Sequence, residues 1–209
     1  MHVLLLDNRD SFVWNLAHAF GSLDCAIDVV RSDTVGVDQI LSETGNRPDA
    51  IVLSPGPGRP EDAGCSVPLL QAMSEDESTV IPTLGVCLGH QAIAHAFGAE
   101  IDRSPPCHGK AWPIYHQDRW PFEGLENPLD LARYHSLAVR REQLPDVLEE
   151  LAATEEGVIM ALRHRRLPML GFQFHPESFL SERGFELCRR FLASAGSWPS
   201  NGRFVEIDT

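Results

Sequence analysis

The sequence predicts a doubly wound α/β protein built on a mostly parallel sheet, with antiparallel strands added to it. Through about the first hundred residues, short unbroken apolar runs alternate with segments of helical spacing. Unbroken apolar runs are typical of strands buried on both faces, and their alternation with helices indicates parallel pairing through right-handed crossovers. From about residue 100, prolines and aromatic residues interrupt the pattern. The shorter β-like runs that follow predict antiparallel strands in the sheet or beside it.

Four strands and the helices between them follow in order along the first half. The strands are expected at residues 3–6, 26–30, 50–53 and 80–86. The first helix is expected at residues 12–20, with Asp10 or Ser11 as its N-cap and with Phe12, Leu16, Ala19 and Phe20 on one face. Further helices are expected near residues 37–41, at 67–73 and at 91–97.

The second half continues with shorter elements and ends in a helix. Strands are expected at residues 131–134, 137–139, 158–162 and 169–174. A last helix at 182–193 places Phe185, Leu187, Cys188, Phe191 and Leu192 on roughly one side. The chain shows no internal repeat, so we expect one domain over residues 1–195 and a polar tail over 196–209.

Composition and charge restrict the class of protein. The 209 residues are 43% hydrophobic and 22% charged, as in soluble globular proteins. A net charge of -13 argues against nucleic acid or an anionic membrane as a partner. The five cysteines are scattered, and the N-terminus lacks the basic flank and apolar length of a signal peptide. We therefore expect a cytoplasmic protein without a membrane span.

The most informative feature is Cys87, which follows an apolar run and precedes helix-compatible residues. A strand, a tight turn and a helix place a side chain on an exposed elbow. A helix N-terminus directed at a thiol favours the thiolate, which is the nucleophilic form. The segment therefore predicts an enzyme that attacks an electrophilic carbon through a covalent intermediate.

A base for this nucleophile is predicted at a second strand end. His175 closes an apolar run, and Glu177 follows two residues later. In an extended chain, residues i and i+2 point to the same side, so Glu177 can accept from one imidazole nitrogen while the other faces Cys87. This predicts a Cys-His-Glu triad.

The third segment is the Pro-Gly loop at residues 54–58, which follows the strand at 50–53. Alternating proline and glycine hold a loop rigid and leave backbone N–H groups exposed. We expect the N–H groups of Gly56 and Leu88 to form an oxyanion hole. Carboxyl ends of parallel strands meet at one edge, so this loop and the segments at 7–11 and 87–91 are expected to lie together.

Each segment alone has a more ordinary interpretation. Cys87 would be a small buried hydrophobe, His-Pro-Glu a turn, and the Pro-Gly loop a turn as well. His90 and His95 are five residues apart, which is not the spacing of a shared metal site on a helix, and no second pair has zinc spacing. Together, the three strand ends carry complementary chemistry, and that combination favours the catalytic interpretation without a metal.

The segments 87–91, 174–178 and 54–58 together resemble the class I (triad-type) glutamine amidotransferases. Two further features narrow the resemblance to the glutaminase component of anthranilate synthase and of aminodeoxychorismate synthase. They are the segment 7–12 and the pair formed by His108-Gly109-Lys110 and residues 133–137. The likeness runs from about residue 3 to residue 192 and implies a flavodoxin-like sheet.

The resemblance implies a role for each matching position. Cys87 would attack the side-chain amide of glutamine, and His175, oriented by Glu177, would act as acid and base. Glutamine would be held by Gly56, Pro57, Gly58, Gln91, Ser136 and Leu137. Ammonia would pass to a chorismate-binding synthase subunit, component I, to make anthranilate or 4-amino-4-deoxychorismate. The resemblance implies no cofactor in this subunit and a partner that uses Mg²⁺.

The sequence departs from the family pattern at two places, and it also allows alternative functions. Arg9 stands where tyrosine is common, and Ala111-Trp112 stands where small hydroxyl residues are usual. Both put the geometry of the partner in doubt. The alternatives are a stand-alone γ-glutamyl hydrolase or cysteine peptidase on the same fold, and a non-catalytic regulatory subunit. The segment 180–184 leans toward the para-aminobenzoate branch.

Overall fold

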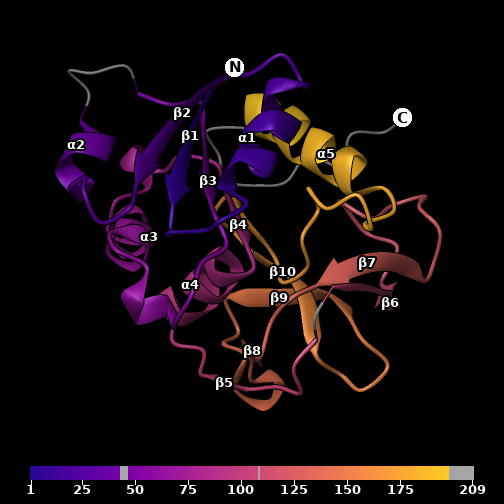
Figure 1. The fold of residues 1–209 in the computed structure, drawn as a ribbon. Coiled ribbons are helices and arrows are strands. Elements are labelled where there is room, and N and C mark those ends of the chain that lie inside the picture. The colour runs from indigo at the N-terminus through magenta and orange to yellow at the C-terminus, as the bar shows by residue number, and fades with distance from the viewer. Residues whose placement is uncertain (43–46, 108, 198–209) are drawn as a thin grey trace.

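The computed structural model describes residues 1–42, 47–107 and 109–197 (Figure 1). Its centre is a run of parallel strands with apolar sequences on which helices pack. These strands are β1 (His2–Asp7), β2 (Ala26–Arg31), β3 (Ala50–Leu53), β4 (Thr83–Val86) and β11 (Met169–Phe172). They pair in the order β2-β1-β3-β4-β11, which is the doubly wound order of a flavodoxin-like sheet.

Antiparallel strands extend the sheet beyond β11. They are β10 (Ile159–His164), β9 (Leu148–Ala153), β6 (Lys110–His116) and β7 (Leu129–Arg133). Within the described residues the sheet has nine strands in the order β2-β1-β3-β4-β11-β10-β9-β6-β7. A separate pair joins β5 (Ile101–Arg103) to β8 (Leu137–Val139). The predicted fold class is confirmed, although β5, β6 and β9 were not expected.

Helices cover both faces of the parallel strands (Figure 1). The helices are α1 (Val13–Gly21), α2 (Val37–Leu41), α3 (Ser66–Glu75), α4 (Leu88–Ala96) and α5 (Gly184–Ser197). Val3 and Leu5 pack in one core cluster with α1 and α5, whereas Leu4 and Leu6 pack in the other with α2, α3 and α4. Side chains alternate between the faces of a strand, so an unbroken apolar run serves both clusters.

The first helix begins later than expected, which changes the position of Phe12. Helix α1 begins at Val13, and its N-cap is Phe12, whose side chain makes no capping hydrogen bond; neither Asp10 nor Ser11 caps it. Phe12 lies outside the helix, so helical spacing does not set its direction, and its side chain is 64% exposed. Val13 and Ala17 complete the buried face with Leu16 and Phe20 instead, and Ala19 is only partly buried.

Two other predicted boundaries differ from the structure. The strand expected at 80–86 begins only at Thr83, because Pro82 precedes it and residues Glu77–Thr79 form a 3-10 turn. Helix α5, expected at 182–193, spans Gly184–Ser197, and residues 198–209 of the predicted tail lie outside the described residues. Phe185 is 47% exposed and leaves the buried side of that helix.

The remaining described segments are short connections. Two further 3-10 turns span Pro60–Asp62 and Arg141–Gln143. All five cysteines are free thiols. None of the helices in the described part of the chain has the length and apolar character needed to span a membrane.

Candidate active site

Cys87 occupies a strained elbow between β4 and α4. Its backbone has φ 52° and ψ −99°, a conformation that residues other than glycine rarely adopt and that costs on the order of 1–3 kcal/mol. The Cys87 N–H donates to the Phe172 carbonyl at 2.7 Å, which ties the elbow to β11. The expected strand, turn and helix are therefore present, with Cys87 at the helix N-terminus.

Glycines on both sides of the cysteine make the elbow possible. A Cβ atom at Gly85 would lie 2.3 Å from the Gly89 carbonyl oxygen, and one at Gly89 would lie 2.3 Å from the Leu53 carbonyl oxygen. Both contacts are with backbone atoms, which cannot move aside easily. The first turn of α4 can therefore approach β3 and β4 only because these two positions lack a side chain.

His175 and Glu177 form a buried pair at the end of β11. His175 Nδ1 lies 2.7 Å from Glu177 Oε1, and their side chains are 10% and 3% exposed. An ionised carboxylate only accepts hydrogen bonds, so Nδ1 carries the proton and donates it. The Ser181 hydroxyl donates to the His175 carbonyl at 2.6 Å and holds the backbone of the turn.

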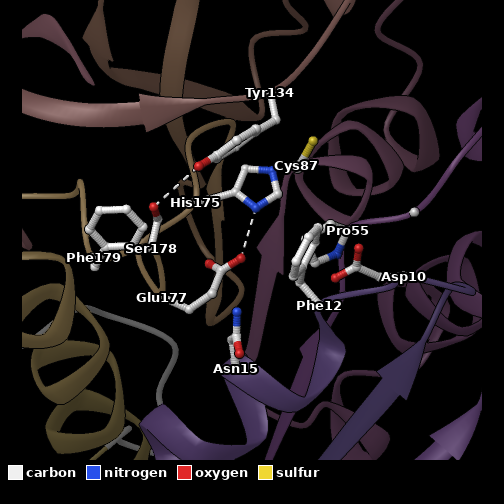
Figure 2. A pocket seen from close by; sticks show the side chains of 11 residues that line it. Asp10, Phe12, Asn15, Pro55, Cys87, Tyr134, His175, Glu177, Ser178 and Phe179 are labelled. Carbon is white, nitrogen blue, oxygen red and sulfur yellow. Dashed lines mark hydrogen bonds and ion pairs between the residues drawn. The ribbon is translucent and has the colours of Figure 1, made fainter. Parts of the chain in front are cut away.

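The second nitrogen of His175 is left for Cys87. Figure 2 shows the imidazole ring between the Cys87 sulfur and the Glu177 carboxylate. Burial lowers the pKa of His175, but hydrogen bonds and charge from Cys87 and Glu177 outweigh it and raise the pKa well above its usual value. Among the described residues, the buried Nε2 atom makes no hydrogen bond of good geometry, so it is free to exchange a proton with a neighbouring group. A thiol beside a base that a carboxylate orients can perform nucleophilic acyl transfer.

The three side chains line one cavity of about 510 Å³ (Figure 2). Its walls come from the turn after β1, the Pro-Gly loop after β3, the elbow after β4 and the segment after β11. The lining residues are Asp10, Phe12, Asn15, Pro55, Gly56, Cys87, Tyr134, His175, Glu177, Ser178 and Phe179. The predicted meeting of the loops at the carboxyl edge of the parallel strands is therefore present.

Comparison with known proteins agrees with this geometry. The family model of class-I glutamine amidotransferases matches residues 4–195. The chain belongs to this family. It is 47% identical to anthranilate synthase component 2 of Azospirillum brasilense, over 91% of this chain and 94% of that one. It is 46% identical to aminodeoxychorismate synthase component 2 of Klebsiella aerogenes, over 91% and 98%. A glutamine amidotransferase from Thermotoga maritima shares the fold, with a TM-score of 0.71, 16% identity and coverage of 93% and 97%.

The predicted oxyanion residues of this class I amidotransferase are brought together. A Cβ atom at Gly56 would lie 3.0 Å from a methyl carbon of Leu88 and 2.3 Å from the Asn8 carbonyl oxygen. Asn8 fixes the loop, because its N–H donates to Ser54 Oγ and its amide donates to the Ser54 carbonyl, both at 2.8 Å. Ser66 at the start of α3 donates to Asn8 Oδ1. The backbone of Gly56 therefore sits in a rigid frame beside Leu88.

The predicted glutamine-binding residues divide into two groups. Gly56 lines the cavity with Cys87, whereas Pro57 and Gly58 are exposed and lie outside its lining. Gln91, Ser136 and Leu137 lie outside the lining as well, but the Gln91 amide donates to the Leu137 carbonyl at 2.9 Å. The structure thus joins α4 to β8, and it does not bring all six predicted residues into one cavity.

A chain of buried polar groups supports this second group. The Leu137 carbonyl also contacts His135 Nδ1 at 2.9 Å, so that nitrogen carries the proton. The Arg133 guanidinium then donates to His135 Nε2 at 3.2 Å. Burial, followed by the charge of Arg133, lowers the pKa of His135 to about 4. His135 is therefore neutral, with one tautomer, and the carbonyl that binds Gln91 is held in place.

The sequence interpretation gave no role to the other residues around the cavity, although Asp10, Phe12, Tyr134 and Ser178 lie in segments that it singled out; Asn15 and Phe179 lie outside those segments. Asp10 and Asn15 come from the turn after β1 and from α1, and burial raises the pKa of the Asp10 carboxyl. Phe12, Tyr134 and Phe179 are aromatic residues at the mouth. Only position in the fold distinguishes them from ordinary surface residues, so the sequence carried no signal for them. His108, part of the predicted family signature, lies outside the described residues.

No metal site accompanies this arrangement in the described part of the chain. Among residues 1–42, 47–107 and 109–197, no three His, Cys, Asp or Glu side chains are grouped closely enough to hold a metal ion. The site itself offers a thiol, an imidazole, a carboxylate and backbone N–H groups.

Proposed function

We propose that this chain is a glutaminase subunit that hydrolyses L-glutamine to glutamate and ammonia and delivers the ammonia to a chorismate-binding synthase subunit. The product of the complex would be anthranilate or 4-amino-4-deoxychorismate. The observation that carries the proposal is the arrangement of Cys87, His175 and Glu177 in one cavity of a class I amidotransferase. Relatives at 46% and 47% identity, named as component 2 of the two synthases, support the type of complex.

The proposed chemistry proceeds through a γ-glutamyl thioester. The Cys87 sulfur attacks the side-chain amide carbon of glutamine, and the backbone N–H groups of Gly56 and Leu88 stabilise the oxyanion. His175 then gives its proton to the departing nitrogen, so the carbon–nitrogen bond breaks and ammonia leaves. In the second half, His175 takes a proton from water, the hydroxide attacks the thioester carbon, and glutamate leaves as the thiol is restored.

A Cys87→Ala variant in the complex with the synthase subunit tests this proposal. Glutamine-dependent synthesis should fall to background, because no thioester can form, whereas synthesis from chorismate and added ammonia should continue. A complex that keeps its glutamine-dependent activity would refute the proposal. A wild-type chain with rapid hydrolysis in the absence of any partner would favour the stand-alone hydrolase instead.

The mouth of the cavity supports a partner on this side of the molecule. Phe179 is 93% exposed, Phe12 is 64% exposed and Tyr134 is 41% exposed, and all three line the cavity (Figure 2). Exposed aromatic residues gathered around a site are typical of protein interfaces. We place the synthase subunit over this mouth, because ammonia released at Cys87 then leaves toward the partner.

Replacement of an aromatic residue at the mouth tests the position of the partner. Phe179→Asp should weaken the complex at least about tenfold in calorimetric titration, because a charge replaces a buried interface ring. The matched control is Val147→Asp. Val147 is 44% exposed, but the strand register places it at the end of the sheet away from Cys87. Equal weakening by both variants would contradict the placement.

The partner would determine the product and the metal requirement. We propose that Mg²⁺ acts on the synthase subunit and that the glutaminase chain needs no metal. EDTA should then stop the use of chorismate while glutamate formation by the complex continues. Isolation of the natural partner, followed by identification of the aminobenzoate isomer, would show which of the two products the complex makes. It would also test the prediction from residues 180–184 that the chain serves the para-aminobenzoate pathway.

A further inference from the structure

Gln173 is a fully buried polar residue that contacts the proposed nucleophile. It is 0% exposed, and its Nε2 atom donates to Cys87 Sγ at 3.6 Å. Its Oε1 atom accepts from Gln91 Nε2 at 3.0 Å. One side-chain amide therefore joins the elbow cysteine to the residue that the family resemblance assigns to glutamine binding. Gln173 takes no part in the bond changes and proton transfers proposed above.

The backbone after β11 fixes the direction of this side chain. The Gln173 N–H donates to the Met160 carbonyl at 2.8 Å, and the His175 N–H donates to the Ala132 carbonyl at 3.0 Å. The rings of Phe172 and Phe174 stack at 4.7 Å on the apolar side. Gln173 lies two residues before His175, and the chain turns directly after His175, where the Ser178 N–H donates to the His175 carbonyl at 3.2 Å. The amide is thus held by the same segment that holds the proposed base.

The hydrogen-bond inventory of Gln91 shows what Gln173 does for it. An amide nitrogen has two hydrogens, and those of Gln91 go to the Leu137 carbonyl at 2.9 Å and to Gln173 Oε1 at 3.0 Å. Both donors are therefore occupied within the protein. The carbonyl oxygen is left as the atom of Gln91 that can accept a hydrogen bond from a ligand. Without Gln173, the Gln91 amide nitrogen would keep only the Leu137 carbonyl as a partner, and one of its two hydrogens would be unpaired.

We propose that Gln173 is a positioning residue of the glutaminase site, which donates to the Cys87 sulfur and fixes the orientation in which Gln91 meets glutamine. This inference rests on the proposed function. A donor on the sulfur stabilises the thiolate, and hydrogen bonds to charged atoms are stronger than neutral ones. The neutral amide does so without adding a charge that would compete with His175.

Two variants separate the two contacts. Gln173→Met keeps the length of the side chain but removes the donor and the acceptor. Gln173→Glu at mildly alkaline pH keeps an acceptor for Gln91 and replaces the donor on sulfur by a carboxylate. Thr83→Val is the matched control, because it removes a buried hydrogen bond, from Thr83 Oγ1 to the Ile81 carbonyl at 2.8 Å, at the other end of β4.

The first measurement is the rate of Cys87 alkylation by iodoacetamide as a function of pH, in the full chain. Both Gln173 variants should react about tenfold more slowly near neutral pH, with the half-maximal rate shifted to higher pH. The second is glutamine hydrolysis in the complex. The Met variant should have a lower kcat and a higher KM than the wild type. The Glu variant should have a lower kcat, but its KM should stay within about twofold of the wild-type value.

The outcomes are decisive in both directions. Folded Gln173 variants with the alkylation profile and KM of the wild type would overturn the inference, as would a Thr83→Val control that shifts the profile equally. Urea denaturation establishes that each variant is folded, and either Gln173 variant suffices if the other fails to fold. A wild-type complex without glutamine hydrolysis would refute the proposed function instead, while the alkylation comparison still tests the contact between Gln173 and Cys87.

Discussion

Acidification should destabilise this protein through His90, which is buried beneath the elbow. Its ring lies in α4 against Gly171 of β11, where a Cβ atom would be 2.7 Å from His90 Nδ1. Neither ring nitrogen makes a hydrogen bond of good geometry within the described residues. Burial, with a smaller contribution from the nearby His135, lowers the pKa of His90 from 6.5 to about 3. The folded protein therefore holds a neutral imidazole.

The sign of the effect follows from proton binding. Below its ordinary pKa of 6.5, the unfolded chain binds a proton at His90, whereas the folded chain does so only near 3. Because the unfolded state binds more protons in this window, the free energy of unfolding falls as the pH falls. The difference amounts to about 2 kcal/mol near pH 5. Total stabilities are about 5–15 kcal/mol, so such a loss is measurable.

Urea denaturation of the wild type and of His90→Leu between about pH 5 and pH 7.5 tests this magnitude. On acidification over this range, the free energy of unfolding should fall by about 2 kcal/mol less in the variant than in the wild type, because the variant has no imidazole at position 90 to protonate. His18→Leu is the control, because His18 is an exposed residue of α1 and its replacement should leave the slope unchanged. Parallel curves for the wild type and His90→Leu would refute the reasoning.

Three further predictions concern the proposed triad, the elbow and a buried thiol. Glu177→Gln should lower the pKa of His175 and reduce glutamine turnover about 100-fold, measured as glutamate release by the complex; a loss under about threefold would contradict the orienting role. Gly89→Ala should destabilise the fold by about 1–3 kcal/mol in urea, because its Cβ would lie 2.3 Å from a backbone oxygen of β3. Gly21→Ala, with open space around it, should change the stability by less than about 1 kcal/mol. Mass mapping after alkylation of the native chain should find Cys188 unmodified, since burial raises its thiol pKa and leaves it 0% exposed.

The parallel half of the fold was predictable because its strands face two cores. β1, β3, β4 and β11 contain the unbroken apolar runs that burial on both faces requires. The antiparallel half lacks that signal. In β9, Glu149 and Glu150 give a polar pattern, and only the fold supplies their partners. Arg163 binds Glu149 at 2.8 Å from β10, and Arg141 binds Glu150 at 2.8 Å.

Strand β6 escaped prediction because it contains Pro113, which cannot donate to a ladder. Its pairing explains why the proline is tolerated. Pro113 pairs with Asp130 of β7, whereas β9 pairs only with Tyr115 and His116. The missing N–H therefore lies on a part of β6 that has a neighbour on one side. This arrangement depends on the register of three strands, and a sequence pattern cannot give that register.

Some residues of the proposed site could be predicted from their place in the sequence, whereas others are recognised only from the fold. Cys87, His175 and Glu177 were predictable because they follow apolar strands and their chemistry is complementary, although β11 ends at Phe172, before the position expected. Gln173 lies two residues before His175 in the same segment, so the sequence did place it near the proposed base. Its significance depended on the distance to Cys87, which lies 86 positions earlier in the chain. Loops that meet only in the folded protein supplied the rest of the cavity.

The departure at Arg9 concerns a side chain that points away from the proposed site. Arg9 has φ 64°, and its guanidinium binds Asp33, which also binds Arg31. These side chains hold the pKa of Asp33 down to about 2. The pair directs Arg9 toward the β2 side, and Arg9 does not line the cavity. Asn8, its buried neighbour, holds the Gly56 loop through Ser54, and these two hydrogen bonds do not involve the Arg9 side chain. In this chain, the Arg9 side chain is therefore held apart from the groups that would release ammonia.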